Sequence, residues 1–415
     1  MGKKICQIES IRPEDKPKDV LTEILREGCH AILKTALEFE MTEFLEDYKE
    51  LRTSEGRQRI TRNGHHRPRP IQTGVGEVMA KVPRAWDQEK GKDGIRFSSK
   101  LLPPYLRRSQ SIEDLLPWLY LKGISTGDFS DALASLLGEG ARGLSAPTVS
   151  RLKKTWESDY KAWNTRSLEG KEYVYVWADG VYMKARMETQ KQCILVLMGS
   201  TPSGEKELIA ILDGYRESEQ SWNELLQGLK HRGLKLAPKL AVGDGALGFW
   251  NALAKVFPET RTQRCWVHKT ANILNKMPKS LHGKAKAAIQ EIWMAEGRAD
   301  AKKAMKAFVA MYGAKYPKAV ACLVKDEDVL LTFYDFPAEH WKHIRTTNPI
   351  ESTFATVRLR TRKTRGCLSR TTALTMVFQL CLCAEKRWQK LCGYKLLGKV
   401  IEGVVFTDGV EDVAA

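Results

Sequence analysis

The stretch Val174-Tyr-Val-Trp-Ala-Asp-Gly180 is an apolar run that ends on an acid, and Leu240-Ala-Val-Gly-Asp-Gly245 repeats the pattern. Such runs, bounded by Asp-Gly, are typical of buried strands that end in a turn. A third acid opens a basic segment in Asn348-Pro-Ile-Glu-Ser352. Hard divalent cations prefer carboxylate oxygens, and two such cations can assist both the attacking and the leaving oxygen of a phosphodiester. The pattern therefore suggests metal-dependent chemistry on nucleic acid, with three candidate ligands: Asp179, Asp244 and Glu351.

The charge balance favours a protein that binds a polyanion. The chain has 415 residues, with 67 Lys and Arg against 50 Asp and Glu and a net charge of +17. Its apolar share of 43% is ordinary for a folded chain of two or three domains. Binding to a membrane surface is the rival interpretation, but it fits poorly, and the notable uncharged stretch 371–384 is shorter than the roughly 20 residues of a spanning helix. A basic surface for a phosphate backbone is the better prediction.

The amino-terminal sequence and the cysteines predict a cytoplasmic location. The start of the chain, Met1 to Cys6, has no apolar signal region, and Cys6 stands where a myristoylation motif has Ser or Thr. Nine cysteines, an odd number without repeated spacing, indicate reduced thiols rather than a disulfide framework.

Residues 1–110 are expected to form a helical and basic-loop region. Apolar residues recur at helical spacing over 20–51. The segment 52–70 holds six arginines, an Asn-Gly pair and two prolines, which predicts an exposed basic loop, and 75–83 alternates weakly like a strand.

Residues 111–165 are predicted to form three helices with short turns. In the last of them, Val149, Leu152 and Trp156 share one face, so Arg151 and Lys154 face outward. This resembles a helix-turn-helix whose second helix enters a DNA major groove, although ordinary helical hairpins have the same pattern. Arg151 and Lys154 are the candidate DNA contacts of this segment.

Residues 166–395 have the pattern of a mixed α/β domain. Strands are expected over 173–178, 193–199, 207–212 and 240–243, with a helix over 218–232 and a possible fifth strand near 262–266. Strands that come first and then alternate with helices predict a mixed sheet flanked by helices. A helical insertion is expected at about 280–345, another helix from 348, and a tail over 396–415.

Each candidate acid also has a purely structural interpretation. An Asp-Gly pair is most often a turn, and the chain has five, at Asp93, Asp179, Asp213, Asp244 and Asp408. Sequence pattern alone does not rank Asp213 below the others.

Glu351 could instead bond back to Asn348 in a capping box. Its neighbours at i+3 and i+4 are Phe354 and Ala355, however, so no lysine or arginine there pairs with the carboxylate. Arg358 and Arg362 continue its face, as suits a metal ligand beside a DNA phosphate.

Cys265 and His268 form a further candidate pair in Arg264-Cys-Trp-Val-His268. They could be half of a zinc site, but no second Cys/His pair with regular spacing follows. If the segment is helical, His268 shares a face with Asn272 and could bond a phosphate or flank a base.

An ordered set of motifs makes the chain resemble bacterial insertion-sequence transposases of the Mutator-like group. The motifs are Leu168-Glu-Gly, Trp177-Ala-Asp-Gly-Val-Tyr-Met-Lys, Gly243-Asp-Gly-Ala, Gln263-Arg-Cys-Trp-Val-His, Pro337-Ala-Glu-His-Trp and Thr347-Asn-Pro-Ile-Glu. The resemblance runs from about Arg62 through Trp388. It implies a ribonuclease-H-like catalytic domain with strand order 3-2-1-4-5, in which Asp213 lies two strands from Asp179.

The resemblance also implies an activity. Asp179, Asp244 and Glu351 would hold Mg²⁺, with Mn²⁺ as a substitute, and Cys265 and His268 would lie near the transferred strand. The enzyme would cut the element ends by hydrolysis and join them to target DNA by transesterification. Its partners would be the terminal inverted repeats and target DNA, bound by a homo-oligomer. The alternative is a domesticated, non-catalytic DNA-binding protein, while a two-carboxylate glycosidase is disfavoured by the basic charge and the third acid.

Overall fold

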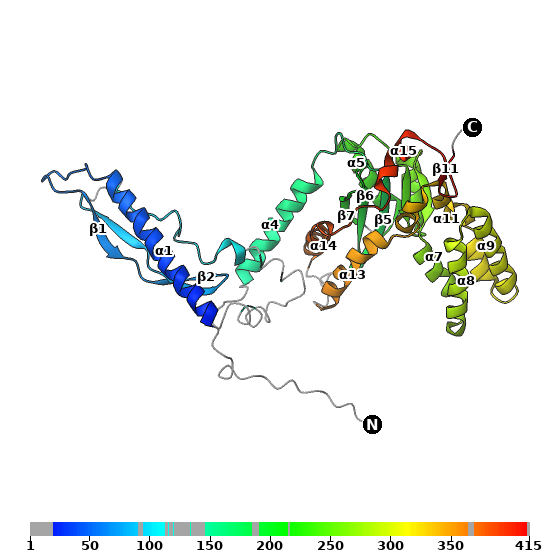
Figure 1. Ribbon diagram of the computed structural model, residues 1–415, viewed down its shortest axis with the longest axis horizontal. Helices are drawn as coiled ribbons and strands as arrows, with labels where there is room; N and C mark the ends of the chain where they lie inside the picture. The colour runs from blue at the N-terminus through cyan, green and yellow to red at the C-terminus, as the bar shows by residue number, and fades with distance from the viewer. Residues whose placement is uncertain are drawn as a thin grey trace, which may run out of the picture. The chain divides into compact units, whose positions relative to one another are not determined.

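A computed structural model of the protein describes residues 20–89, 94–112, 115, 119, 133, 146–184, 191–214, 216–363 and 369–412 (Figure 1). The chain divides into two compact units, a first unit of 1–120 with 124–146 and a second unit of 121–123 with 147–415. Most of the predicted helix-turn-helix-like segment, and Asp93, lie outside the described residues.

The first unit is a long helix packed on short antiparallel strands. Helix α1 (Val20–Asp47) contacts β1 (Ile60–His65), β3 (Gly76–Ala80) and β4 (Pro83–Asp87). Strand β1 pairs with β4, and β2 (Arg69–Thr73) pairs with β3. The buried core of this unit is small and apolar, with Leu37, Ile71, Ala80 and Leu102.

The predicted exposed basic loop over 52–70 is wrong in its second half, which forms β1 and the start of β2. Three of its six arginines bind partners elsewhere in the unit. Arg59 donates two hydrogen bonds to Asp87 at 2.8 and 3.0 Å, Arg62 pairs with Glu38 at 2.7 Å, and Arg69 donates to four main-chain carbonyls over 102–106. These partners lie 24 to 37 residues away, so local composition did not reveal them.

The second unit is built on a five-stranded mixed sheet of order β7-β6-β5-β8-β9. Strands β5 (Tyr175–Lys184), β6 (Lys191–Ser200) and β7 (Lys206–Gly214) are antiparallel, while β8 (Leu240–Gly243) and β9 (Arg261–Arg264) run parallel to β5. The predicted strands and their order are confirmed. Strand β5 is longer than predicted, because Asp179 and Gly180 stay in the ladder opposite Val196 and Leu195.

Helices cover both faces of this sheet (Figure 1). On one face, α5 (Glu219–His231) and α6 (Leu247–Val256) share a core with alternate β5 residues such as Val176 and Ala178. On the other, α13 (Asn348–Lys363) packs on β5 and α14 (Arg370–Glu385) packs on β7.

Helix α4 (Ala146–Asn164), the last helix of the predicted 111–165 segment, packs against the second unit. The Tyr160 hydroxyl donates to the Ile211 carbonyl at 2.9 Å, and the rings of Tyr160 and Trp163 contact Phe378. This helix therefore belongs to the second unit, and the domain boundary expected near residue 165 stays a prediction.

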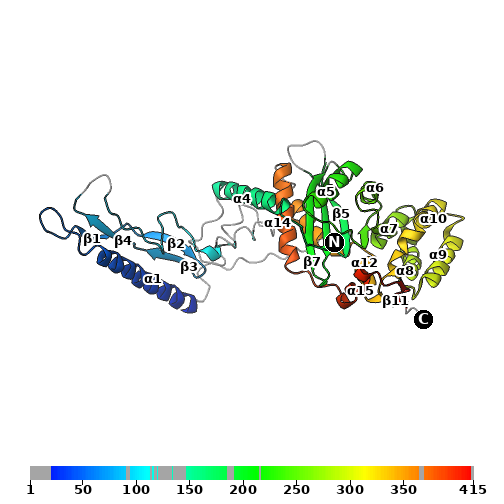
Figure 2. The same cartoon turned by 90° about the horizontal axis from the view of Figure 1, so that it is seen from above.

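The segment between β9 and α13 is helical. It contains α7 (Trp266–Leu274), α8 (His282–Met294), α9 (Arg298–Tyr312) and α10 (Pro317–Val324), followed by the short helices α11 (Glu327–Leu330) and α12 (Trp341–Ile344). Helices α8, α9 and α10 lie together at one end of the second unit (Figure 2). None of the helices in the described part of the chain is long and apolar enough to cross a membrane.

The expected C-terminal tail is a folded part of the second unit. It contains α15 (Leu397–Glu402) and a hairpin of β10 (Phe406–Thr407) with β11 (Val410–Glu411). Asp408 and Gly409, at φ 50° and 82°, form the predicted Asp-Gly turn. The Gly409 amide donates to Tyr334 and its carbonyl accepts from Ala338, both at 3.1 Å.

Candidate active site

Asp179 lies inside β5 and is only 7% exposed. The Gly180 amide donates to its Oδ1 at 2.8 Å, but its buried Oδ2 has no hydrogen-bond partner among the described residues. Burial raises the pKa of Asp179 to about 6, while nearby His268 opposes the rise. A buried carboxylate oxygen without a donor is costly, so this one is suited to a cation.

His268 on α7 and Glu351 on α13 face Asp179. His268 Nε2 lies 3.3 Å from Glu351 Oε1. One possible ligand atom from each of these three residues lies within 4.8 Å of the other two. No lysine or arginine forms an ion pair with Glu351 among the described residues, in line with the prediction, and α7 brings His268 to it instead.

Cys265 links the start of α7 to the start of α13. Its buried Sγ accepts hydrogen bonds from the Thr347 amide at 3.2 Å and hydroxyl at 3.3 Å. The Thr347 carbonyl accepts from the amide of Glu351, and its hydroxyl lies 3.4 Å from His268 Nδ1. Cys265 thus positions His268 and Glu351, and it belongs to no metal-ligand cluster in the described part of the chain.

The start of α13 does not need Glu351 as a cap. The Asn348 amide, which a capping box would satisfy, already donates to Thr346 Oγ1 at 3.4 Å. The carboxylate of Glu351 is therefore directed to the site rather than to its own helix.

The charge state of His268 follows from its neighbours. Its hydrogen bond with Cys265, and then the carboxylates of Asp179 and Glu351, raise its pKa to about 9, while burial acts against them. At neutral pH the ring is therefore an imidazolium that compensates two carboxylates in the metal-free protein.

Asp244 is brought beside Asp179 by the parallel pairing of β5 with β8. The last pair of that ladder is Ala178 with Gly243, so both acids come next along their strands. The Ala246 amide donates to Asp244 Oδ1 at 2.7 Å, which is the predicted Asp-Gly turn. Its charge also raises the pKa of Asp179. Asp244 therefore serves the turn and borders the site.

Sequence reasoning missed a fourth acid. Glu217 precedes α5. Its burial, and then the charges of Asp244 and Asp179, raise its pKa to about 7. Its carboxylate accepts a hydrogen bond from the Tyr182 hydroxyl. Nothing in the sequence distinguishes Glu217 from Glu219, an ordinary acid in the first turn of α5 that pairs with Lys255 at 2.5 Å.

The family assignment rests on the whole chain. A sequence profile described as "Transposase, Mutator family" matches residues 3–390. The chain belongs to the Mutator family of transposases.

Relatives within this family of transposases are similar over most of their length. The chain is 53% identical to the transposase of insertion sequence element IS6120 from Mycolicibacterium smegmatis, over 72% of this chain and 92% of the relative. It is 52% identical to the transposase of IST2 from Acidithiobacillus ferrooxidans, over 68% and 95%. A solved structure, the simian T-cell lymphotropic virus intasome with a PP2A regulatory subunit, matches 50% of this chain and 63% of that chain. Its TM-score is 0.16 at 14% identity, a likeness too low to carry an argument.

In this Mutator-family transposase, Asp213 lies in β7, and its neighbour across the ladder is Ile194 of β6. Arg370 binds both of its carboxylate oxygens at 2.9 Å. Asp213 is therefore a structural acid paired with Arg370. The turn interpretation is wrong for both Asp213 and Asp179, because both lie within strands.

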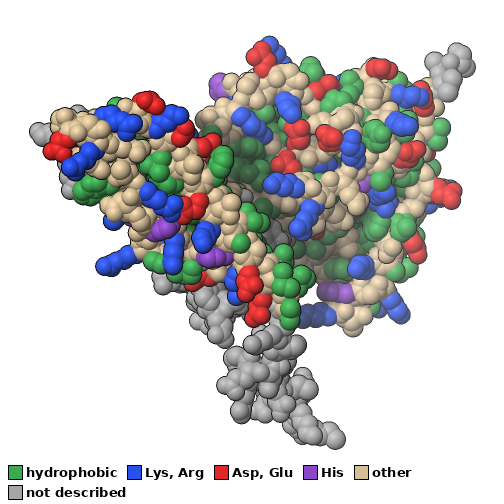
Figure 3. Space-filling view, turned by 60° about the vertical axis from the view of Figure 1, so that its left-hand side comes forward, with side chains coloured by type: hydrophobic (Ala, Val, Ile, Leu, Met, Phe, Trp, Pro, Cys, Tyr) green, Lys and Arg blue, Asp and Glu red, His purple; other side chains and the backbone are tan. Residues whose placement is uncertain are grey.

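The predicted DNA contacts lie on two helices of the transposase. Arg151 and Lys154 are exposed on α4, and Arg358 is exposed on α13. Arg362 belongs to α13, but its side chain lies outside the described residues. Lysine and arginine side chains spread over the face seen in Figure 3, mixed with acidic ones, rather than gathering in one patch.

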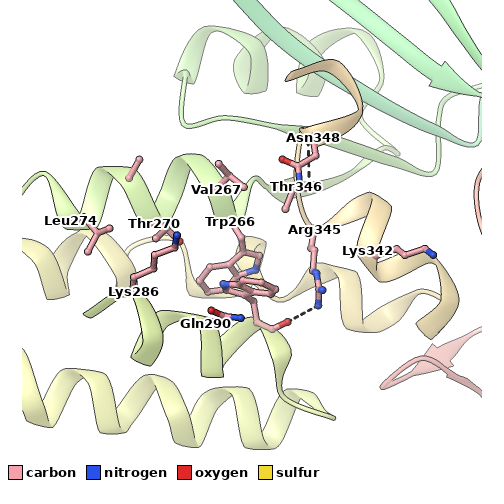
Figure 4. A pocket seen from close by; sticks show the side chains of 12 residues that line it. Trp266, Val267, Thr270, Leu274, Lys286, Gln290, Lys342, Arg345, Thr346 and Asn348 are labelled. Atoms are coloured by element: carbon pink, nitrogen blue, oxygen red, sulfur yellow. Dashed lines mark hydrogen bonds between the residues drawn. The ribbon is translucent and has the colours of Figure 1, made fainter. Parts of the chain in front are cut away.

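A cavity of about 390 Å³ adjoins the helices of the site (Figure 4). It lies among α7, α8 and the segment before α13, and Arg345 packs its guanidinium 4.5 Å from the centre of the Trp293 ring. The α7 residues that line it, from Trp266 to Leu274, do not include His268 or Asn272. The cavity is therefore separate from the carboxylates.

Proposed function

We propose that this transposase cuts DNA at the ends of its insertion sequence and joins the freed ends to target DNA by transesterification. The observation that carries this proposal is the convergence of Asp179, His268 and Glu351 within 4.8 Å, with one buried Asp179 oxygen lacking a partner among the described residues. A site built this way suits a divalent cation, and the basic charge of the chain suits DNA.

Asp179, Asp244 and Glu351 are the proposed ligands for Mg²⁺, with Mn²⁺ as a substitute. The donor set fits, because it offers carboxylate oxygens, which these hard cations prefer. When bound, the metal would supply activation of the attacking oxygen and stabilisation of the leaving oxygen of a phosphodiester.

The other residues of the site would act on the DNA strand. His268, held by Thr347 and Glu351, presents a cationic ring beside the carboxylates and would orient a phosphate of the reacting strand by charge and hydrogen bonding. Cys265 would support this by fixing α7 to the start of α13. Arg358, exposed further along the same helix as Glu351, would bind the next phosphates.

The fold that we propose for the second unit is ribonuclease-H-like. The order β7-β6-β5-β8-β9 supports it, because the first acid then lies on the central strand and the second at the end of its parallel neighbour. We also propose that α4, with Arg151 and Lys154 exposed, contributes to binding the terminal inverted repeats, and that a homo-oligomer assembles on DNA.

Cleavage and binding assays on labelled element ends would test this function. Asp179→Asn should lose Mg²⁺-dependent cleavage and joining while its affinity for the ends in a gel-shift assay stays within about threefold, because affinity comes mainly from basic groups. Undiminished cleavage by this variant would refute the proposed site. Wild-type protein that binds the ends but never cleaves them would favour the non-catalytic alternative.

A further inference from the structure

We propose that Arg264 is a positioning residue of the site, which holds the main chain of Asp244 so that its carboxylate meets the divalent cation. This inference rests on the proposed function, because it takes Asp244 as a ligand of that cation. It is carried by two side-chain hydrogen bonds that converge on one carbonyl just after β8.

The first observation is this pair of hydrogen bonds to the Asp244 carbonyl. Asp244 follows the last residue of β8, where the ladders with both neighbouring strands end. Its carbonyl accepts from Arg264 Nη1 at 2.7 Å and from Trp250 Nε1 at 2.8 Å. Two donors, one of them charged, use both lone pairs of the oxygen. They therefore fix the peptide plane that follows Asp244.

The second observation links this peptide to the Asp244 carboxylate. Asp244 Oδ1 accepts a hydrogen bond from the Ala246 amide at 2.7 Å, so the side chain is tied to the turn that begins at its own carbonyl. The direction of the carboxylate therefore follows the main chain over 244–246. A rotation of that peptide would turn the carboxylate as well, and the bonds from Arg264 and Trp250 oppose it.

Arg264 is itself held in place by the strand and by an aromatic ring. It is the last residue of β9 and pairs with Gly243 of β8. Its guanidinium carbon lies 4.8 Å from the centre of the Trp250 ring. That ring packs on the main chain of β8, since a Cβ built on Gly243 would lie 3.1 Å from Trp250 Cζ2. The stacked, half-buried guanidinium is thus preorganised for its bond to the carbonyl.

Arg264 and its neighbour Cys265 hold two arms of the site from adjacent positions. Cys265 Sγ accepts hydrogen bonds from Thr347, at the start of the helix that bears Glu351. Arg264 holds the end of the strand that precedes Asp244. The end of β9 therefore sets the positions of two proposed metal ligands, one through each residue.

Arg261 provides a matched control on the same strand. Its guanidinium carbon lies 5.3 Å from the centre of the Phe336 ring, and it forms an ion pair with Asp335. Both arginines thus combine an aromatic ring with an acceptor. Arg261, however, begins β9 opposite Leu240, at the far end of the strand from Asp244. Arg261→Gln removes a comparable side chain without affecting the Asp244 carbonyl.

The experiment is a titration of full-length, DNA-free protein with Mn²⁺ alone, followed by the electron paramagnetic resonance signal of free Mn²⁺. Arg264→Gln should raise the Kd by about 10- to 100-fold, the range seen when residues that support a metal ligand are changed. Trp250→Phe keeps the ring and removes one donor, so it should raise the Kd by about 2- to 10-fold. Arg264→Lys keeps a charged donor and should fall between wild type and Arg264→Gln. Arg261→Gln should stay within about threefold.

Asp244→Asn separates this inference from the proposed function. Weaker Mn²⁺ binding in Asp244→Asn, with wild-type affinity in folded Arg264→Gln, would overturn the positioning role alone. Wild-type affinity in Asp244→Asn would remove Asp244 from the proposed ligands, and the positioning role with it. Equal weakening by Arg264→Gln and Arg261→Gln would show a general effect of β9 and would also overturn the role.

A direct contact with DNA is the alternative role of Arg264. The residue lines a cavity of about 180 Å³ together with Asp244 and Asn272, and its other N–H groups are donors for a phosphate. As a positioning residue, it should leave the affinity for labelled element ends, measured by gel shift without metal, within about threefold in Arg264→Gln. Wild-type Mn²⁺ affinity combined with weaker end binding would overturn the positioning role.

Circular dichroism of the metal-free protein checks the fold of each variant. If Arg264→Gln does not fold, Arg264→Lys and Trp250→Phe carry the test, because each keeps the packing of its side chain and changes only the donor to the Asp244 carbonyl. Wild-type Mn²⁺ affinity in both of these folded variants would contradict the proposal.

Discussion

Particular carboxylates of the two units have opposite surroundings. In the first unit, Arg59 holds the pKa of Asp87 well below its usual range, and Arg62 with His65 lowers that of Glu38. In the second unit, burial raises the pKa of Asp179 and of Glu217. With a net charge of +17, the chain has more lysine and arginine side chains than acidic ones. Asp179 and Glu217 nevertheless form no ion pair with a lysine or arginine among the described residues, and this separates them from Asp87 and Glu38.

The same contrast occurs within one sheet. Asp213 and Asp179 each precede a glycine in a strand, yet only Asp213 has a guanidinium on both oxygens. Asp179 has a buried oxygen with no partner among the described residues. We expect substitutions at compensated acids to affect folding, and substitutions at uncompensated acids to affect chemistry.

The largest expected effect is at the proposed metal ligands other than Asp179. Glu351→Gln and Asp244→Asn should each lower cleavage of an element end by more than about 100-fold, beyond what supporting residues around a metal usually cost. A Mg²⁺-dependent cleavage assay with labelled ends would measure it. Either variant with near wild-type cleavage would remove that residue from the site.

The next largest effect is expected at His268, the cationic ring beside Asp179 and Glu351. His268→Ala should slow strand transfer by about 100-fold, because small misplacement of reacting atoms costs that much. Affinity for the ends should change far less. Equal losses in binding and transfer would mean that His268 serves only to hold DNA, and stoichiometric zinc lost together with folding would favour a structural metal.

The pairing of His268 also predicts a pH dependence of the metal-free protein. The folded pKa is about 9 and the ordinary value is 6.5. Because the pKa is raised on folding, the contribution to stability is complete below about 6.5 and is lost as the pH rises through 9. Allowing for solvent screening of this partly exposed ring, the loss should be up to about 2 kcal/mol. Chemical denaturation at pH 6 and pH 9.5 would measure it, and His268→Ala should abolish the difference attributable to this group.

The smallest effect should come from the first unit. Asp87→Asn removes a buried charge that Arg59 binds, so amides of β1 and β4 should exchange hydrogen about 10-fold faster or more, because hydrogen bonds to a charged group are lost. Mass spectrometry of exchange in the full chain would show it, with β5 as the internal reference. Cleavage reduced along with this local loosening would contradict a structural role for the pair.

The sequence predicted the central sheet well because its strands are apolar runs of the right length between turn residues. The runs ending near Asp179 and Asp244 are confirmed as neighbouring parallel strands. The boundary of β5 was wrong, since an Asp-Gly pair has the same local pattern in a turn as in a ladder. Pairing with Val196 and Leu195 keeps it extended.

The parts that could not be predicted depend on partners distant in sequence. The basic segment 52–70 resembles a loop until Glu38 and Asp87 are seen to bind its arginines. Glu217 resembles Glu219 until folding places one over Gly180 and the other beside Lys255. Local spacing carries neither fact, because both arise from packing between elements.

The most direct test of the central claim compares Asp179→Asn with Asp213→Asn in one cleavage assay. The two substitutions are chemically identical and lie in the same sheet. Asp179→Asn should lower Mg²⁺-dependent cleavage by more than about 100-fold. Asp213→Asn should leave cleavage within about threefold while costing about 1.5–3 kcal/mol of stability through its bond to Arg370. Comparable loss of cleavage in both folded variants, or full activity in Asp179→Asn, would contradict the account.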